Sequence, residues 1–227
     1  MNEKIYAVAI DGPGGAGKST IARTIARELE ILYVDTGAIY RTVGYHVYLR
    51  GFEPTDTNAV VALLDETNIE MAYGEDGLQR MYLNGEDVTE KIRLPEMSMY
   101  ASRVSAIPEV RAFLMEMQRS MARTNSVVMD GRDIGTVVLP DAQVKIFLTA
   151  DLEARARRRY KELQERGMTT DFSTLLEEMR QRDYNDSHRA TAPLKAADDA
   201  VVVDTTNMNF EQSCQKILDV IRERVGV

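Results

Sequence analysis

Short apolar runs alternate with longer amphipathic stretches along this chain. Five runs have the length and composition of β-strands, at residues 5–10, 31–34, 127–129, 144–148 and 200–203. Each is continuously apolar rather than alternating, which is typical of strands covered on both faces. Helical patterns separate most of them. The pattern therefore predicts an α/β fold in which helices flank a five-stranded parallel sheet.

Residues 37–123 interrupt this alternation. They contain predicted helices at 38–49 and 58–67, predicted antiparallel strands at 68–73 and 78–84, and two later helices. A turn cluster at 74–77 joins the strands, and Pro108 suits the start of the last helix. A single crossover connection between two parallel strands needs fewer helices and strands than these residues contain. We therefore expect an inserted subdomain at 37–123, within a core formed by 1–36 and 124–227.

Composition and charge narrow the class of protein. The 227 residues suffice for one sizeable core, and the net charge of −8 makes the chain a poor general binder of nucleic acid or anionic membranes. The single cysteine, Cys214, allows no intrachain disulfide and fits a reducing compartment. No apolar run is long enough for secretion or for a membrane span. We expect a cytoplasmic protein that holds anionic small molecules with clustered arginines.

The segment after the first predicted strand carries the strongest chemical signal. It fits the phosphate-loop pattern G-x-x-x-x-G-K-[ST], between a strand and a helix predicted over 18–29. Its residues are Gly12, Pro13, Gly14, Gly15, Ala16, Gly17, Lys18 and Ser19, followed by Thr20. Backbone N–H groups and the helix N-terminus favour a phosphate, Lys18 reaches its outer oxygens, and Ser19 offers a hydroxyl to Mg²⁺. The alternative is a chance glycine-rich turn.

Other polar clusters have both a structural and a functional interpretation. Asp130 ends a predicted strand and either supports Mg²⁺ or caps a turn. The segments 35–41 and 130–136 either bind a nucleotide at the carboxyl edge of the sheet or have structural roles only. In the structural interpretation, 35–41 is a capped helix start and 130–136 is a salt-bridged surface loop. The charged helix predicted at 151–167 carries four arginines, and Arg182, Asp186 and Arg189 follow an i, i+4, i+7 spacing on one helix face. The arginines of 151–167 and the later charged set either bind phosphates or form ordinary solvent-exposed helix faces.

Five segments give the chain its family resemblance. They are IDGPGGAGKST at 10–20, DTGAIYR at 35–41, DGRDIGTVV at 130–138, VKIFLTA at 144–150 and HRATAPL at 188–194. With these segments the chain resembles the bacterial cytidylate kinases, a family of nucleoside monophosphate kinases, over essentially its whole length. The resemblance implies ATP-dependent phosphorylation of CMP and dCMP, with Mg²⁺, on a phosphate-loop core. It also implies that 37–123 binds CMP and that 151–167 forms a small lid.

The same resemblance implies roles for individual residues. Lys18, Arg155, Arg158 and Arg182 would be catalytic, and Ser19 with Asp130 would serve the metal. CMP would contact Thr36, Arg41, Ser102, Arg111, Arg132, Asp133, Asp186 and Arg189. Two positions depart from the pattern: Ser19 stands where many relatives carry glycine, and Thr36 stands where serine is expected. The first departure leaves open whether Ser19 or Thr20 faces the metal.

Three alternatives remain open at this point. A kinase for another small molecule, such as AMP, UMP, a sugar or a shikimate-like acid, would use the same core. A GTPase-type switch would carry an Asn-Lys-x-Asp segment, which this sequence lacks. An ATPase module of a larger machine would need a docking extension, and none is evident. We expect a monomer whose partners are the small molecules ATP and CMP or dCMP, with neither nucleic acid nor a membrane as a partner.

Overall fold

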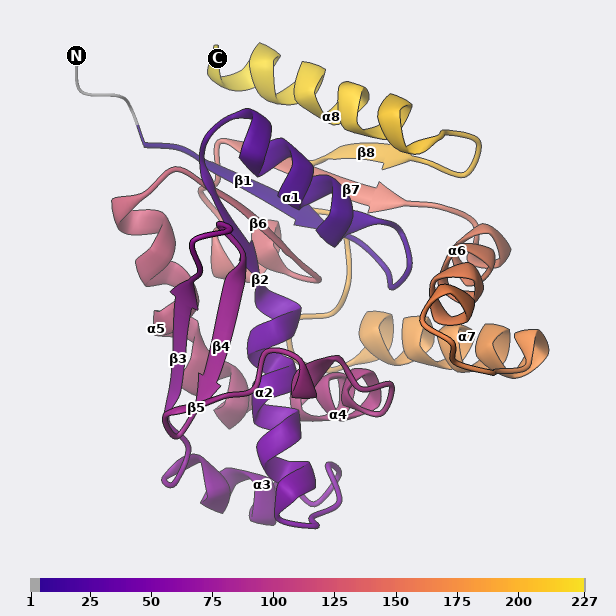
Figure 1. Cartoon of the computed structure of the whole chain (residues 1–227). Helices are drawn as coiled ribbons and strands as arrows, with labels where there is room; N and C mark the ends of the chain where they lie inside the picture. Colours follow the sequence, from indigo (N-terminus) through magenta and orange to yellow (C-terminus); the bar gives the residue numbers. More distant parts are fainter. Residues whose placement is uncertain (1–4, 227) are drawn as a thin grey trace. The chain divides into compact units, whose positions relative to one another are not determined.

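The computed structural model describes residues 5–226, and the chain divides into two compact units (Figure 1). One unit combines the residues up to Tyr33 with those from Ala122 onward, and the other comprises Val34–Met121. Within the described residues, no helix has the length and apolar character needed to cross a membrane.

A five-stranded parallel sheet forms the centre of the larger unit, as predicted. Its strand order is β2-β6-β1-β7-β8. The strands are β1 (Ala7–Asp11), β2 (Leu32–Asp35), β6 (Val127–Gly131), β7 (Val144–Thr149) and β8 (Val201–Asp204). In the middle of the sheet, Val8 lies opposite Val128 on one side and Val144 on the other. The two edge strands, β2 and β8, are only four residues long.

Two helices, α1 (Lys18–Glu28) and α8 (Phe210–Val225), pack their apolar faces onto this sheet (Figure 1). Ile10 of β1, Ile25 of α1 and Ile217 of α8 belong to this core, and all three are fully buried. Burying a side chain of this size contributes about 1.5–3 kcal/mol relative to leaving it exposed. A capping box between Asn209 and Gln212 begins α8, so the helix starts at a defined residue.

A second, smaller apolar cluster joins α6 (Leu152–Glu165) to α7 (Phe172–His188). Ala156 and Leu163 of α6 pack with Leu175 and Met179 of α7. Because α7 ends at His188, one prediction is wrong: Arg182 and Asp186 lie on this helix, but Arg189 follows it in extended backbone. The chain turns there because the Leu194 N–H donates back to the carbonyl of Asp186.

The unit Val34–Met121 combines helices with a small antiparallel sheet. The elements lying in it are α2 (Thr36–Leu49), α3 (Thr57–Leu64), β3 (Ile69–Tyr73), β4 (Gln79–Leu83), β5 (Glu86–Asp87), η1 (Lys91–Arg93), α4 (Met97–Val104) and most of α5 (Pro108–Thr124). The antiparallel pairing of β3 and β4 is confirmed, with Ile69 opposite Leu83. The sequence did not predict β5, because its two residues are polar and exposed.

Gly12 lies where two strands and the phosphate loop meet. Its φ is +148°, and a Cβ added there would lie 1.9 Å from the carbonyl oxygen of Leu148 on β7. That oxygen belongs to the backbone of a central strand, so it cannot move aside as a flexible side chain would. The first glycine of the phosphate loop is therefore required by packing as well as by the turn.

We predict that Gly12→Ala destabilises the fold by at least about 3 kcal/mol, because the added methyl group overlaps a strand carbonyl. Gly51→Ala is the matched control: Gly51 also has a positive φ, +68°, but no atom of the described part of the chain lies within 4 Å of its added Cβ. The control substitution should lower the free energy of unfolding by only about 1–2 kcal/mol, the cost of placing a residue with a Cβ in the left-handed region. Urea unfolding of both variants checks this, and equal losses would contradict it.

Candidate active site

Lys18 is the first residue of α1, and its ammonium group turns back into the phosphate loop. Its Nζ donates to the carbonyl oxygen of Pro13 over 2.8 Å, and the residue is only 5% exposed. Burial, followed by the nearby cation of Arg132, lowers the pKa of Lys18 well below its ordinary value, while Asp130 and Asp11 oppose the shift. A buried ammonium held among backbone dipoles suits an anionic phosphate as its natural partner.

Ser19 and Asp130 meet at the carboxyl end of β6. The Ser19 hydroxyl donates to Oδ2 of Asp130 over 2.9 Å, and the hydroxyl of Tyr33 donates to Oδ1 over 2.9 Å. Asp130 is buried, whereas Thr20 is exposed. Hydroxyl and carboxylate oxygens are the donors that Mg²⁺ prefers. Among residues 5–226, no cluster of three or more His, Cys, Asp or Glu residues could hold a metal.

Asp11, the last residue of β1, holds the loop that follows β6. Its two carboxylate oxygens accept the backbone N–H groups of Ile134 and Gly135, each over 2.7 Å. These residues begin the short π-helical turn η2 (Ile134–Val138), directly after Asp133. Burial raises the pKa of Asp11 to about 6, although the bonds from Gly135 and Ile134 act in the opposite direction. One carboxylate thus fixes the start of the phosphate loop relative to the Arg132–Asp133 segment.

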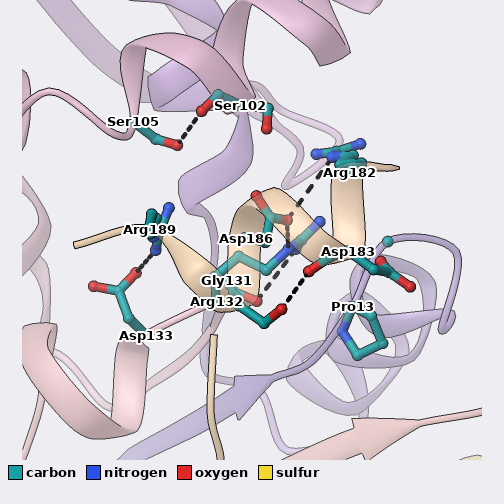
Figure 2. A network of polar contacts seen from close by, with 12 residues as sticks. Pro13, Ser102, Ser105, Gly131, Arg132, Asp133, Arg182, Asp183, Asp186 and Arg189 are labelled. Atoms are coloured by element: carbon teal, nitrogen blue, oxygen red, sulfur yellow. Dashed lines mark hydrogen bonds and ion pairs between the residues drawn. The ribbon is translucent and has the colours of Figure 1, made fainter. Parts of the chain in front are cut away.

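Two ion pairs link the segment after β6 to the end of α7 (Figure 2). Arg132 Nε donates to Asp186 Oδ2 over 3.0 Å, and Arg189 NH2 lies 3.4 Å from Asp133 Oδ1. Arg189 also donates from Nε to the Ala192 carbonyl over 2.7 Å. The structure therefore brings together four of the predicted CMP-binding residues. Each segment supplies one cation and one anion.

Arg182, one turn before Asp186 on α7, adds a third cation to this cluster. Its Nε lies 3.9 Å from Asp186 Oδ2 (Figure 2). Burial alone would raise the pKa of Asp186, but Arg132, Arg182 and Arg189 outweigh it and hold the pKa below its ordinary value. The cluster therefore keeps a charged carboxylate among three guanidinium groups. Guanidinium groups so arranged suit a phosphate, which they hold by bidentate hydrogen bonds.

The predicted arginines of α6 contact the chain itself. Arg155 is 5% exposed; it donates to the carbonyls of Ala150 and Gly14, over 2.7 and 3.0 Å, and pairs with Asp183 over 2.6 Å. Arg158 donates to the carbonyl and the hydroxyl of Thr205, over 2.6 and 3.1 Å. These bonds tie α6 to the phosphate loop, to α7 and to the segment after β8.

In the smaller unit, the predicted site residues of α2 surround Asp35. The Asp35 carboxylate caps α2 by accepting the Ala38 N–H over 2.9 Å, and its other oxygen pairs with Arg41 over 3.0 Å. Thr36, the first residue of α2, is buried. The helix cap and the guanidinium group therefore share one carboxylate.

Ser102 and Arg111 lie near one another through Ser105. The Ser102 carbonyl accepts from the Ser105 hydroxyl over 3.0 Å, and Arg111 NH1 lies 3.4 Å from the Ser105 carbonyl oxygen. Arg111 is 3% exposed, and its guanidinium carbon lies 5.8 Å from the ring centroid of Tyr40. The four predicted residues of this unit thus lie on α2, α4 and α5.

The sequence interpretation missed several supporting residues, of which Asp11 is the clearest. It follows an apolar strand, and the same criterion that selected Asp130 would have selected it. Tyr33, Asp183 and Thr205 gave no such signal, because their partners are brought close only by folding.

Comparison with known proteins identifies relatives of this chain. The sequence model of the cytidylate kinase family matches residues 8–223. A cytidylate kinase of Caldicellulosiruptor bescii is 51% identical over 212 residues, covering 93% of each chain. One from Fervidobacterium nodosum is 49% identical over 220 residues, covering 97% of this chain and 98% of the relative. A solved structure of an uncharacterized protein from Eubacterium ventriosum matches with a TM-score of 0.51 and 13% sequence identity. The match covers 96% of this chain and 99% of that protein, and at this identity it shows a shared fold alone.

The parallel sheet, the phosphate loop and the buried lysine, together with these relatives, define a phosphate-loop transferase of the nucleoside monophosphate kinase class. The chain belongs to the cytidylate kinase family.

We predict that Asp11 makes stability depend on pH. Its pKa is about 6 in the folded chain, against an ordinary value of 3.8, so the folded state favours the protonated form. The stability contributed by this group is therefore fully present below about pH 4 and is lost as the pH rises through 6. The unfolding free energy of the wild type minus that of Asp11→Asn should fall by up to about 3 kcal/mol between pH 4 and 7, then level off. Urea unfolding across this range measures it, and a pH-independent difference would refute it.

Proposed function

We propose that this chain transfers the γ-phosphoryl group of ATP to CMP and dCMP, giving CDP or dCDP and ADP. The observation that carries the proposal is membership of the cytidylate kinase family across residues 8–223. The large size of the insertion and the polar segment after β6 support a nucleotide acceptor rather than a small sugar or acid. The absence of an Asn-Lys-x-Asp segment disfavours a GTPase-type switch.

The phosphate loop is assigned to ATP. Residues 12–20 would surround the β- and γ-phosphates, with backbone N–H groups directed inward and Lys18 neutralising the transferring group. Arg155 and Arg158 bind backbone carbonyls, so we assign them to holding the loop and α6 in place. Arg182 lies in the cluster with Asp186, and we assign to it the neutralisation of negative charge on the transferring phosphoryl group.

Ser19 and Asp130 fit a magnesium ion, because a hydroxyl and a carboxylate meet at the strand end beside the phosphate loop. Between the two hydroxyls left open by the sequence, the contact with Asp130 favours Ser19 over the exposed Thr20. When bound, Mg²⁺ would neutralise charge on the phosphate oxygens of ATP.

Eight residues are assigned to CMP: Thr36, Arg41, Ser102, Arg111, Arg132, Asp133, Asp186 and Arg189. The arginines would hold the acceptor phosphate, and Ser102, Arg111 and Asp133 would contact the cytosine edge. A phosphate oxygen of CMP forms the new bond to the γ-phosphorus while the bond from that phosphorus to the β–γ bridging oxygen breaks. This oxygen is already anionic near neutral pH, because the second pKa of a phosphomonoester is about 6. The reaction therefore needs no general base, and catalysis consists of positioning and charge neutralisation.

We further propose a monomer that works in the cytoplasm on small-molecule nucleotides. The single cysteine, buried in α8, and the acidic composition support this placement.

An acceptor screen tests the proposal directly. The purified full chain, supplied with ATP and Mg²⁺, should convert CMP and dCMP to their diphosphates faster than it converts AMP, UMP or GMP. Chromatographic separation of the products identifies each diphosphate, and a reaction without acceptor measures background hydrolysis. Failure to form CDP would overturn the proposed function, and faster conversion of another acceptor would assign a different kinase.

We also expect Lys18→Ala to lower kcat by roughly 10²–10³-fold, the size seen when one preorganised donor to a developing charge is removed. The fold should persist, because within residues 5–226 the side chain makes a single hydrogen bond, to Pro13. Lys91→Ala, at an exposed lysine paired with Glu86, is the matched control and should turn over normally. Steady-state rates and thermal unfolding check both variants, and a wild-type rate in Lys18→Ala would remove this residue from the mechanism.

A further inference from the structure

A buried glutamine at the start of β4 binds the backbone of Asp35. Oε1 of Gln79 accepts the Asp35 N–H over 2.9 Å, and Nε2 of the same amide donates to the Asp35 carbonyl oxygen over 3.2 Å. Gln79 is 9% exposed, so water does not compete freely for these bonds. One side-chain amide thus satisfies both backbone groups of a single residue, as a neighbouring strand would.

Asp35 in turn fixes the residues assigned to the acceptor. Its carboxylate caps α2 at Ala38 and pairs with Arg41, and Thr36 follows it directly. The packing here is close, because a Cβ added at Gly37 would lie 3.0 Å from Arg41 NH1 and 3.1 Å from Asp35 Oδ1. A displacement of the Asp35 backbone would therefore move the helix cap and the guanidinium group together.

We propose that Gln79 is a positioning residue for CMP, which orients Thr36 and Arg41 through the backbone of Asp35. The inference rests on the proposed function, since it assumes that these two residues contact CMP. It also gives the small antiparallel sheet a role: β4, paired with β3 and β5, presents the amide from a rigid element. Groups held by hydrogen bonds to a regular strand are placed more accurately than groups on a free loop.

The test compares two buried glutamines of the same unit. Gln79→Met keeps the approximate shape and removes both bonds to Asp35. Gln118→Met makes the same chemical change on α5, where Gln118 is fully buried and donates to the Leu114 carbonyl of its own helix. We expect Gln79→Met to raise the KM for CMP roughly tenfold while leaving the KM for ATP within twofold, because only the acceptor residues are displaced. Gln118→Met should leave both KM values near those of the wild type.

A double-mutant cycle separates positioning from general loss of stability. If Gln79 acts through Asp35 and Arg41, Gln79→Met should raise the KM for CMP much less in an Arg41→Ala background than alone. Gln79→Glu, which keeps the length and the acceptor but loses the donor, supplies a second variant if Gln79→Met does not fold. It should show the same selective rise in the KM for CMP.

The outcomes distinguish this inference from the proposed function. A wild-type chain that forms no CDP would overturn the proposed function itself. A wild type that forms CDP, with an unchanged CMP KM in the folded glutamine variants, would overturn only the role of Gln79. Equal rises in the KM for CMP and for ATP, or additive effects in the cycle, would also overturn it.

Discussion

Two backbone N–H groups donate hydrogen bonds to the Asp11 carboxylate, and these bonds hold the phosphate-loop end of the larger unit together. Asp11 ends the central strand immediately before Gly12, and its partners, Ile134 and Gly135, come immediately after Asp133. Burial of this carboxylate is costly, and the two N–H groups at the start of η2 offset part of the cost because each oxygen accepts one of them. The phosphate loop and the loop after β6 are thereby fixed to each other at one point. The placement of Lys18 on one side and of Arg132 on the other follows from that point.

Near this anchor, three arginines of the larger unit pair with carboxylates of the same unit. Arg132 pairs with Asp186, Arg189 with Asp133 and Arg155 with Asp183. Clustered guanidinium groups repel one another, so interspersed carboxylates allow them to lie close together in the folded chain. Each ion pair also restricts its side chain to one geometry. On the proposed function, an anionic nucleotide would meet cations whose positions are already set, which would reduce the ordering that binding requires.

The sequence predicted the elements that depend on local signals and missed those that depend on contacts made across the chain. The five core strands follow from continuous apolar runs, and the phosphate loop follows from a motif complete within residues 12–19. The helix face proposed for Arg182, Asp186 and Arg189 extended one residue too far, because the bond from Leu194 to Asp186 that turns the chain is not visible in helical spacing. The pairings of Arg132 and Arg189 join residues 54 and 56 positions apart, and no sequence pattern identifies which acid each arginine selects. The sequence therefore names the residue types of the candidate site, whereas the partner of each residue could not be predicted from it.

The brevity of the two edge strands has a consequence for solubility. A sheet edge presents unpaired N–H and C=O groups that can recruit a strand from another molecule, and long flat edges are prone to aggregation. Here β2 and β8 offer only four residues each. On β2 the amide of Gln79 also occupies both backbone groups of Asp35, and on β8 the exposed Val202 is followed within two residues by the charged Asp204. Ordered growth of the sheet from one molecule into the next is thus discouraged at both edges, so the parallel sheet ends within its own chain.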